Sequence, residues 1–239
     1  MVNQHFIGYK ANIVQKIICL EIRDLLITFA NMFSNIEFWV KTPNWVPNLL
    51  KQATWQIPSQ QKMLYLTFDD GPTPDATEWV LEQLQQYNAK ATFFLIGENV
   101  EKNRKEYEIL KASPHQIGNH TYNHLSGWKT KNKTYFDNIE QANELIQSPF
   151  FRPPYGKLKW SQYQQLKKQY RLIMWDVVPG DFLPNVDGNE CFRRIKKYAK
   201  PGSIIVLHDS EKCFETVKVC LPQVLEYFSN EGYTFESVF

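Results

Sequence analysis

The stretch Met63-Leu64-Tyr65-Leu66-Thr67-Phe68-Asp69-Asp70-Gly71-Pro72 joins a short apolar run to two adjacent carboxylates. The apolar run is typical of a strand, and Gly-Pro after an acidic residue is typical of a turn. We therefore expect a strand over residues 63–68 that ends at Asp69 and Asp70, with a turn that aims both carboxylates.

Two histidines, His120 and His124, follow the acidic pair about fifty residues later with i, i+4 spacing. On a helical turn both imidazoles would point to one side and reach one ion. One carboxylate of the pair and the two histidines then form a three-ligand set for a divalent metal, with a position open for water or substrate. The other carboxylate is left beside the metal as a candidate general base, and the set predicts metal-assisted hydrolysis. Taken alone, each motif has a plainer interpretation. The segment Asp69-Asp70-Gly71-Pro72 could be an ordinary turn, and the spacing of the two histidines could arise by chance.

Short apolar runs alternate with helical patterns after residue 61. Strands are expected at 63–68, 91–96, 115–118, 150–152, 172–177, 203–207 and 233–238. Helices are expected at 77–87, 99–111, 134–147, 160–169, 188–199 and 215–230. Regular alternation predicts parallel strands with helices outside, and seven strands can close into a barrel. The candidate chemical residues follow the strands, at the face where such barrels carry their active sites.

Five segments also occur in the order seen in polysaccharide deacetylases. They are residues 67–72, 120–124 and 152–156, Asp181-Phe182, and Leu207-His208-Asp209. Residues 62–239 thus resemble the NodB-homology group, carbohydrate esterase family 4, which includes chitin, chitooligosaccharide, peptidoglycan and acetylxylan deacetylases. The resemblance implies a distorted (β/α)7-type barrel, a bound divalent metal and an N-acetylated glycan substrate. Ligand type makes zinc the default ion, and the affinity order also admits cobalt or nickel.

The resemblance assigns roles to single residues. It implies that Asp69 is the catalytic base and that Asp70 binds the metal with His120 and His124, although the reverse assignment of the two carboxylates is chemically open. Arg152 is expected to contact the base, because a guanidinium lowers the pKa of a neighbouring carboxylate and fixes its direction.

His208 is the candidate general acid, which must be cationic near neutral pH to protonate a leaving amine. A carboxylate partner raises the pKa of a histidine and fixes its tautomer. By resemblance that partner is Asp181, and Asp176 is a rival. Asp209 is next in sequence but is expected to point to the other face of its strand.

Four further residues are expected to contact substrate. Tyr155 matches a family position whose backbone N–H binds the oxyanion of the transition state, with Pro154 beside it. Leu207 matches a position that lines the acetyl-methyl pocket. Phe182 stands where the family often has Trp, so one wall of that pocket has a smaller ring without an N–H donor.

Residues 1–61 are expected to form an N-terminal extension, partly helical and irregular, before a catalytic domain at 62–239. Charges interrupt the apolar stretch 13–33, so a spanning helix and a clean export signal are both disfavoured. The alternatives are an amphipathic helix on the domain or a membrane surface, an extension upstream of a start at Met32, or a degenerate anchor. Without an export signal a cytoplasmic location is expected, and the family's extracellular polymer substrates keep the cell envelope open.

Composition excludes little else. The net charge of +2 does not favour nucleic-acid binding. The four cysteines include no CxxC, and reduced, partly buried thiols are favoured over a Cys213–Cys220 disulfide. We therefore expect a hydrolase that removes N-acetyl groups from an amino-sugar polymer or oligomer. The alternatives are an O-acetyl esterase or small-molecule amide hydrolase on the same fold, and an inactive glycan-binding homologue.

Overall fold

A computed structural model describes residues 39–239 of the chain. The helix, anchor and start site considered for residues 1–38 lie outside the described residues. Within 39–239, none of the helices is both long and apolar enough to span a membrane.

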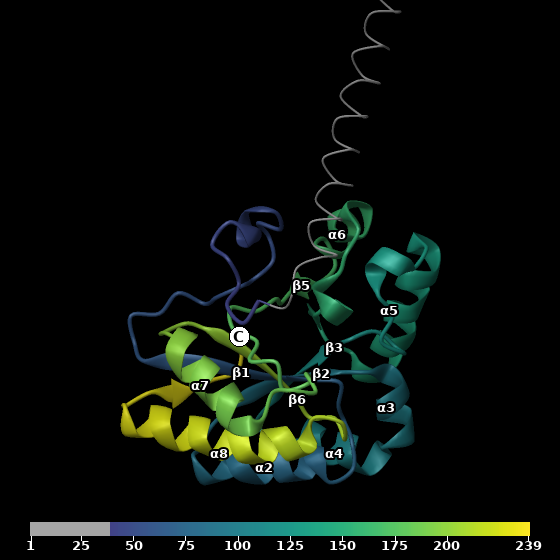
Figure 1. Cartoon of the computed structure of the whole chain (residues 1–239). Coiled ribbons are helices and arrows are strands. Elements are labelled where there is room, and N and C mark those ends of the chain that lie inside the picture. Colours follow the sequence, from purple (N-terminus) through teal and green to yellow (C-terminus); the bar gives the residue numbers. More distant parts are fainter. Residues whose placement is uncertain (1–38) are drawn as a thin grey trace, which may run out of the picture. The chain divides into compact units, whose positions relative to one another are not determined.

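A parallel sheet forms the centre of the structure (Figure 1). Its strands are β1 (Met63–Asp69), β2 (Ala91–Leu95), β3 (Gln116–Asn119), β4 (Phe150–Phe151), β5 (Arg171–Leu172), β6 (Ile204–His208) and β7 (Thr234–Phe235). The order is β5-β4-β3-β2-β1-β6, and β7 pairs with the start of β1. This curled, incompletely closed barrel confirms the predicted α/β fold.

The segment after β5 joins the two edges of the sheet. Ile173 bridges to Thr54, and Val177 bridges to Ile205 of β6. The expected strand at 172–177 is therefore wrong over most of its length. The backbone N–H groups of residues 176 and 177 both donate to the carbonyl of Ile204, so a regular ladder cannot continue there.

Helices cover the outside of the sheet. They are α2 (Ala76–Gln86), α3 (Gly97–Lys102), α4 (Arg104–Ala112), α5 (Asn132–Ile146), α6 (Trp160–Leu166), α7 (Gly188–Tyr198) and α8 (Phe214–Asn230), with 3-10 turns η1 (Val46–Asn48), η2 (Gly127–Lys129) and η3 (Pro154–Gly156). The single helix expected at 99–111 is two helices, because Asn103 leaves the helical conformation and donates from Nδ2 to the carbonyl of Pro72.

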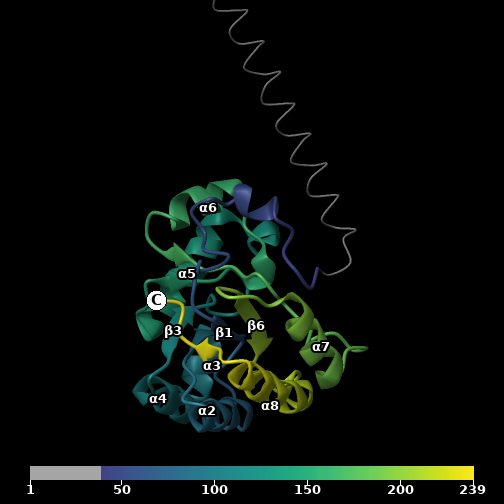
Figure 2. The ribbon, with the colours of Figure 1, turned by 90° about the vertical axis from the view of Figure 1, so that its left-hand side faces the viewer.

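Side-chain alternation along β1 separates the core from the site. Leu64, Leu66 and Phe68 are fully buried in one apolar cluster with residues of α2 and α8. These two helices lie side by side in both views (Figures 1 and 2). Thr67 and Asp69 point to the opposite face, toward the barrel interior. The core therefore fixes which β1 side chains are available for chemistry.

Residues 40–61 belong to the same compact unit as the barrel. Bridges join Lys41 to Val177, Thr54 to Ile173 and Gln56 to Ser203, and the Trp55 side chain is buried. The expected boundary at residue 62 therefore lies too late. Residues 40–61 have the irregular backbone that was expected, but the sequence did not predict these pairings.

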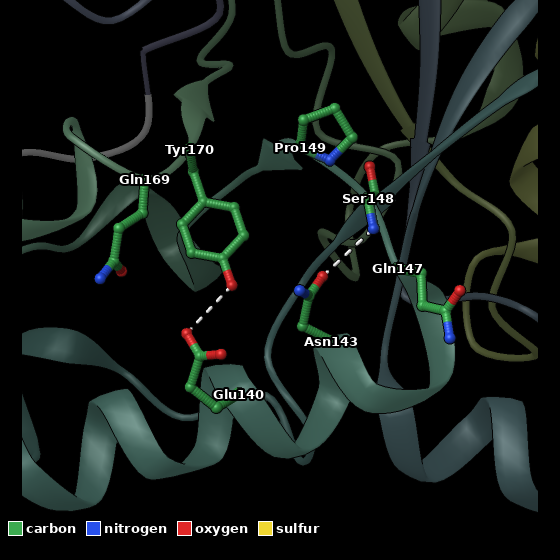
Figure 3. A pocket seen from close by; sticks show the side chains of 7 residues that line it. All are labelled: Glu140, Asn143, Gln147, Ser148, Pro149, Gln169 and Tyr170. Carbon is green, nitrogen blue, oxygen red and sulfur yellow. Dashed lines mark hydrogen bonds between the residues drawn. The ribbon is translucent and has the colours of Figure 1, made fainter.

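A polar hollow opens between α5 and the amino ends of β4 and β5 (Figure 3). Tyr170 donates to Glu140 across 3.2 Å, and Ser148 N–H donates to Asn143 Oδ1 across 3.2 Å. Because it lies at the amino ends of these strands, this hollow is remote from the residues with predicted chemical roles.

Candidate metal and catalytic site

The predicted chemical residues gather at the carboxyl ends of the strands. Asp69 ends β1, His120 follows β3, Arg152 follows β4 and His208 ends β6. Asp181 is the exception, because it lies in the loop before α7, nine residues after β5. The structure still brings it to the site through a hydrogen bond with His208.

Asp70, His120 and His124 place three ligand atoms within 4.8 Å of one another. Asp70 Oδ1 lies 3.2 Å from His124 Nε2 and 3.7 Å from His120 Nε2. This oxygen is buried without a hydrogen-bond partner among the described residues. A buried unpaired carboxylate oxygen facing two imidazoles fits a divalent cation.

The surroundings of His120 favour the neutral form that binds metals. Burial lowers its pKa to about 3, with further contributions from charge on His124 and on Arg152. Its Nδ1 donates to the carbonyl of Arg152 over 2.7 Å, which leaves Nε2 free to face Asp70. Such a hydrogen bond fixes both the tautomer and the ring direction of a metal-binding histidine.

The expected helical turn at residues 120–124 is wrong. Thr121 and His124 have positive φ, of 67° and 59°, and the segment forms a bend. Side-chain hydrogen bonds replace the backbone hydrogen bonds that a helical turn would make. Asn119 Oδ1 accepts from Thr121 N–H, and Asn138 Oδ1 accepts from the next two N–H groups.

Strained backbone recurs around these ligands. Asp70 has a φ of 76° and Tyr155 a φ of 60°, in addition to Thr121 and His124. Non-glycine residues rarely adopt such angles, and at functional sites the surrounding structure holds them in place.

Arg152 is the most enclosed charged residue of the site. Its guanidinium is fully buried and donates from Nη1 to Asp69 Oδ1 over 2.6 Å and to Thr67 Oγ1 over 2.8 Å. Nε and Nη2 donate to the carbonyls of Ile173 and Met174. Burial lowers the pKa of Arg152, but the adjacent Asp69 charge opposes that shift. The network fixes the position of Oδ1 and leaves Asp69 Oδ2 directed toward His120, 4.0 Å from Nε2.

His208 donates from Nδ1 to Asp181 Oδ1 over 3.0 Å, and its backbone N–H donates to Asp181 Oδ2 over 2.8 Å. Burial alone would lower the pKa of His208, but the charge and hydrogen bond of Asp181 raise it to about 10. The rival Asp176 pairs with Lys41 and Ser203 instead. Asp209 faces the other way, as expected, and accepts from Thr77.

Three of the four predicted substrate-contacting residues lie beside the site. The Tyr155 ring packs on His124 with centroids 4.6 Å apart, and Pro154 is buried in the same 3-10 turn. Within residues 39–239, no acceptor bonds the Tyr155 N–H. Phe182 meets His208 edge to face, with centroids 5.3 Å apart.

Leu207 does not line the site. It is fully buried in the helix-facing core with Phe68, its neighbour on β1. Because side chains alternate along a strand, Val206 shares the face of His208. The expectation for Leu207 is therefore wrong by one residue.

The sequence analysis did not identify several residues that hydrogen-bond to the site residues and hold them in position. Thr67 supports Arg152, Asn119 and Asn138 hold the histidine bend, and Asn99 donates to the carbonyl of Asp70 over 2.7 Å. Alternation from Asp69 could have identified Thr67. The asparagines carry no signal in the sequence, since their acceptors and donors lie on other elements.

Known proteins resemble this chain over most of its described length. The polysaccharide deacetylase family model matches residues 56–172. A peptidoglycan-N-acetylglucosamine deacetylase of Bacillus cereus is 32% identical over 78% of this chain and 91% of the relative. A chitooligosaccharide deacetylase of Azorhizobium caulinodans is 33% identical over 68% of this chain and 80% of the relative.

The solved structure of the Bc1960 peptidoglycan N-acetylglucosamine deacetylase superposes with a TM-score of 0.76 at 28% identity. The match covers 82% of this chain and 95% of that structure. Other curated relatives are longer, and the chain spans only 30% to 58% of their length.

Proposed function

The chain belongs to the polysaccharide deacetylase family, and on that premise we propose that it is a metal-dependent hydrolase that releases acetate from an N-acetylated amino-sugar polymer or oligomer. One observation carries the proposal. A cation-type donor set, a carboxylate held by a buried arginine and a histidine held by a carboxylate meet at one end of the barrel. Metal-assisted amide hydrolysis can use these three kinds of group as the Lewis acid, the base and the acid.

Asp70, His120 and His124 would hold the metal, and zinc suits the two imidazoles and one carboxylate. When bound, the ion supplies Lewis-acid polarisation of the acetyl carbonyl and lowers the pKa of the attacking water. Cobalt or nickel would suit the same ligands in vitro.

Asp69 acts as the base in this proposal. Arg152 occupies Oδ1, so Oδ2 takes the proton of the attacking water as its oxygen bonds to the acetyl carbon. The negative charge that develops on the carbonyl oxygen is stabilised by the Tyr155 N–H, which within residues 39–239 has no competing acceptor.

His208 acts as the acid. The carboxylate of Asp181 keeps the imidazole cationic and occupies Nδ1, so Nε2 is the atom that donates a proton to the leaving nitrogen. The C–N bond breaks, acetate leaves, and a free amine remains on the sugar.

The test is acetate release from a panel of chitooligosaccharides, peptidoglycan fragments and acetylated xylan. The protein is stripped of metal and reloaded with zinc or cobalt, with Asp69→Asn as control. Metal-dependent release from an N-acetylated glycan, lost in the variant, supports the proposal. Release from xylan alone would make the chain an O-acetyl esterase. No release with metal bound would indicate another amide substrate or a non-catalytic glycan binder.

A further inference from the structure

An exposed ledge of aromatic and cationic side chains extends from the site. We define it as Trp128, Tyr155 and Lys157. The side chains of Tyr155 and Trp128 are 59% and 37% exposed, although large aromatic rings are usually buried. Since the Tyr155 ring packs on His124, the ledge begins at the candidate metal ligands.

Lys157 bridges the two rings. Its Nζ lies 5.5 Å from the centroid of Trp128 and 5.9 Å from that of Tyr155. The side chain is half-buried, and none of the salt bridges among residues 39–239 includes it. An ammonium held at this place without a counter-ion attracts an anion from solution.

The ledge is built on two loops locked together at their backbones. A Cβ on Gly127 would lie 2.4 Å from the carbonyl oxygen of Lys157, so only glycine permits this approach. Trp128 Nε1 donates to the carbonyl of Leu158 over 2.9 Å, and Lys159 Nζ donates to that of Thr130 over 2.7 Å. These contacts hold the Trp128 ring and the Lys157 backbone in place before any ligand arrives, which lowers the entropic cost of binding.

We propose that the ledge binds a carboxylate-bearing sugar next to the N-acetylated residue at the site, which makes the chain selective for acidic over neutral glycans. The proposal rests on the proposed deacetylase function. Aromatic rings offer apolar faces to sugar rings, and the Lys157 ammonium pairs with the carboxylate. A peptide-free glycan of alternating N-acetylglucosamine and N-acetylmuramic acid has this chemistry, since the lactyl group of muramic acid ends in a carboxylate when no peptide is joined to it.

The test compares two substrates of equal length, a chitooligosaccharide and a muramic-acid-containing oligosaccharide without peptides, whose lactyl carboxylates are free. Lys157→Met is expected to lower kcat/KM on the acidic glycan about three- to tenfold through KM, with kcat and the neutral glycan unchanged within about twofold. Lys157→Arg should retain the preference. The matched control is Lys196→Met, because Lys196 also lies over two rings, Phe192 and Tyr227, but on α7.

Salt separates charge recognition from packing. Between about 0.02 M and 0.5 M salt the preference for the acidic glycan should shrink in the wild type and stay flat in Lys157→Met. Equal losses on both glycans, or no preference in the wild type, would overturn the proposal. If the wild type releases acetate from neither glycan, the proposed function has failed. In that case calorimetry measures the binding of both glycans to the protein. If the wild type binds the acidic glycan more tightly than the neutral one, and Lys157→Met abolishes this difference, the proposed role of the ledge is still supported.

Discussion

Arg152 Nη1 donates to Asp69 Oδ1 over 2.6 Å, and neither side chain is more than 5% exposed. Removal of either charge would leave the other buried without a partner, which strongly destabilises the fold. The remaining Arg152 donors hold Thr67 and two backbone carbonyls, so the arginine ties the base to the barrel rather than to solvent.

Arg152→Lys should lower kcat at least about 100-fold, because a lysine keeps the charge but not the planar set of donors that positions Asp69. Arg152→Met should also cost about 3–5 kcal/mol of unfolding free energy. Acetate release and urea unfolding measure the two effects. Arg104→Lys is the control, since its exposed pair with Glu108 should change stability by less than about 0.5 kcal/mol. Unchanged activity in Arg152→Lys would contradict the positioning role.

Asp181→Asn should move the basic limb of the kcat profile to lower pH. Asp181 raises the pKa of His208 to about 10, and without it burial pulls that pKa down. The folded pKa exceeds the unfolded value of 6.5. The stability from this pair is therefore full below pH 6.5 and is lost as pH rises through about 10. Asp176→Asn is a matched control, because this buried carboxylate pairs with Lys41 and Ser203 instead. A shifted limb in the control alone would reassign the partner.

His124→Gln should weaken zinc binding about 100-fold or more, measured by titration of zinc into the stripped protein. The change removes one of three ligand atoms that lie within 4.8 Å of one another. His115→Gln serves as control, since its Nδ1 accepts from the N–H of Ala91, the first residue of β2, at the opposite end of the strand from the site. Removal of metal with a chelator should lower Tm in the wild type, and zinc should restore it. Wild-type affinity in His124→Gln would exclude this ligand set.

Asp209→Asn should flatten the fall in stability between about pH 4 and pH 7. Burial raises the pKa of Asp209 from 3.8 to about 7, so the fold favours the protonated carboxyl. The stability from that preference is full below pH 3.8 and is lost as pH rises through about 7, by on the order of 4 kcal/mol. Urea unfolding at several pH values tests this, and a wild-type slope in the variant would count against it.

Gly71→Ala should unfold more readily and displace Asp209. A Cβ at residue 71 would lie 2.2 Å from Asp209 Oδ2, and this carboxyl has no room to move because Thr77 holds it. We expect a loss of about 1–3 kcal/mol, in the range for overpacked cores. Gly232→Ala is a weak control, since open space surrounds that position but its φ is positive. Equal stability of Gly71→Ala and the wild type would show that the turn adapts.

The strand ends were predictable because a buried strand needs an apolar run, and each run stops where the chain must turn. Asp69, His120, Arg152 and His208 each follow such a run, so parallel topology placed them at one face. The bend at His124 was not predictable, since Asn119 and Asn138 replace the helical hydrogen bonds there. The sequence analysis assigned Leu207 to the site, whereas Val206 shares the face of His208. This depended on which face of β6 packs against the helices.

The sequence by itself determined the class of fold and the kinds of chemical group available, because strand period, helix period and ligand chemistry are local properties. Only the tertiary structure decided the partnerships. Thr67 and Asp69 lie 85 and 83 residues from Arg152, and Asp181 lies 27 residues from His208. Asp176, Asp181 and Asp209 are three carboxylates in the sequence that could each pair with His208. The path of the loops around the barrel brings only Asp181 to the His208 imidazole. Packing across separate strands makes that selection, and no local pattern encodes it.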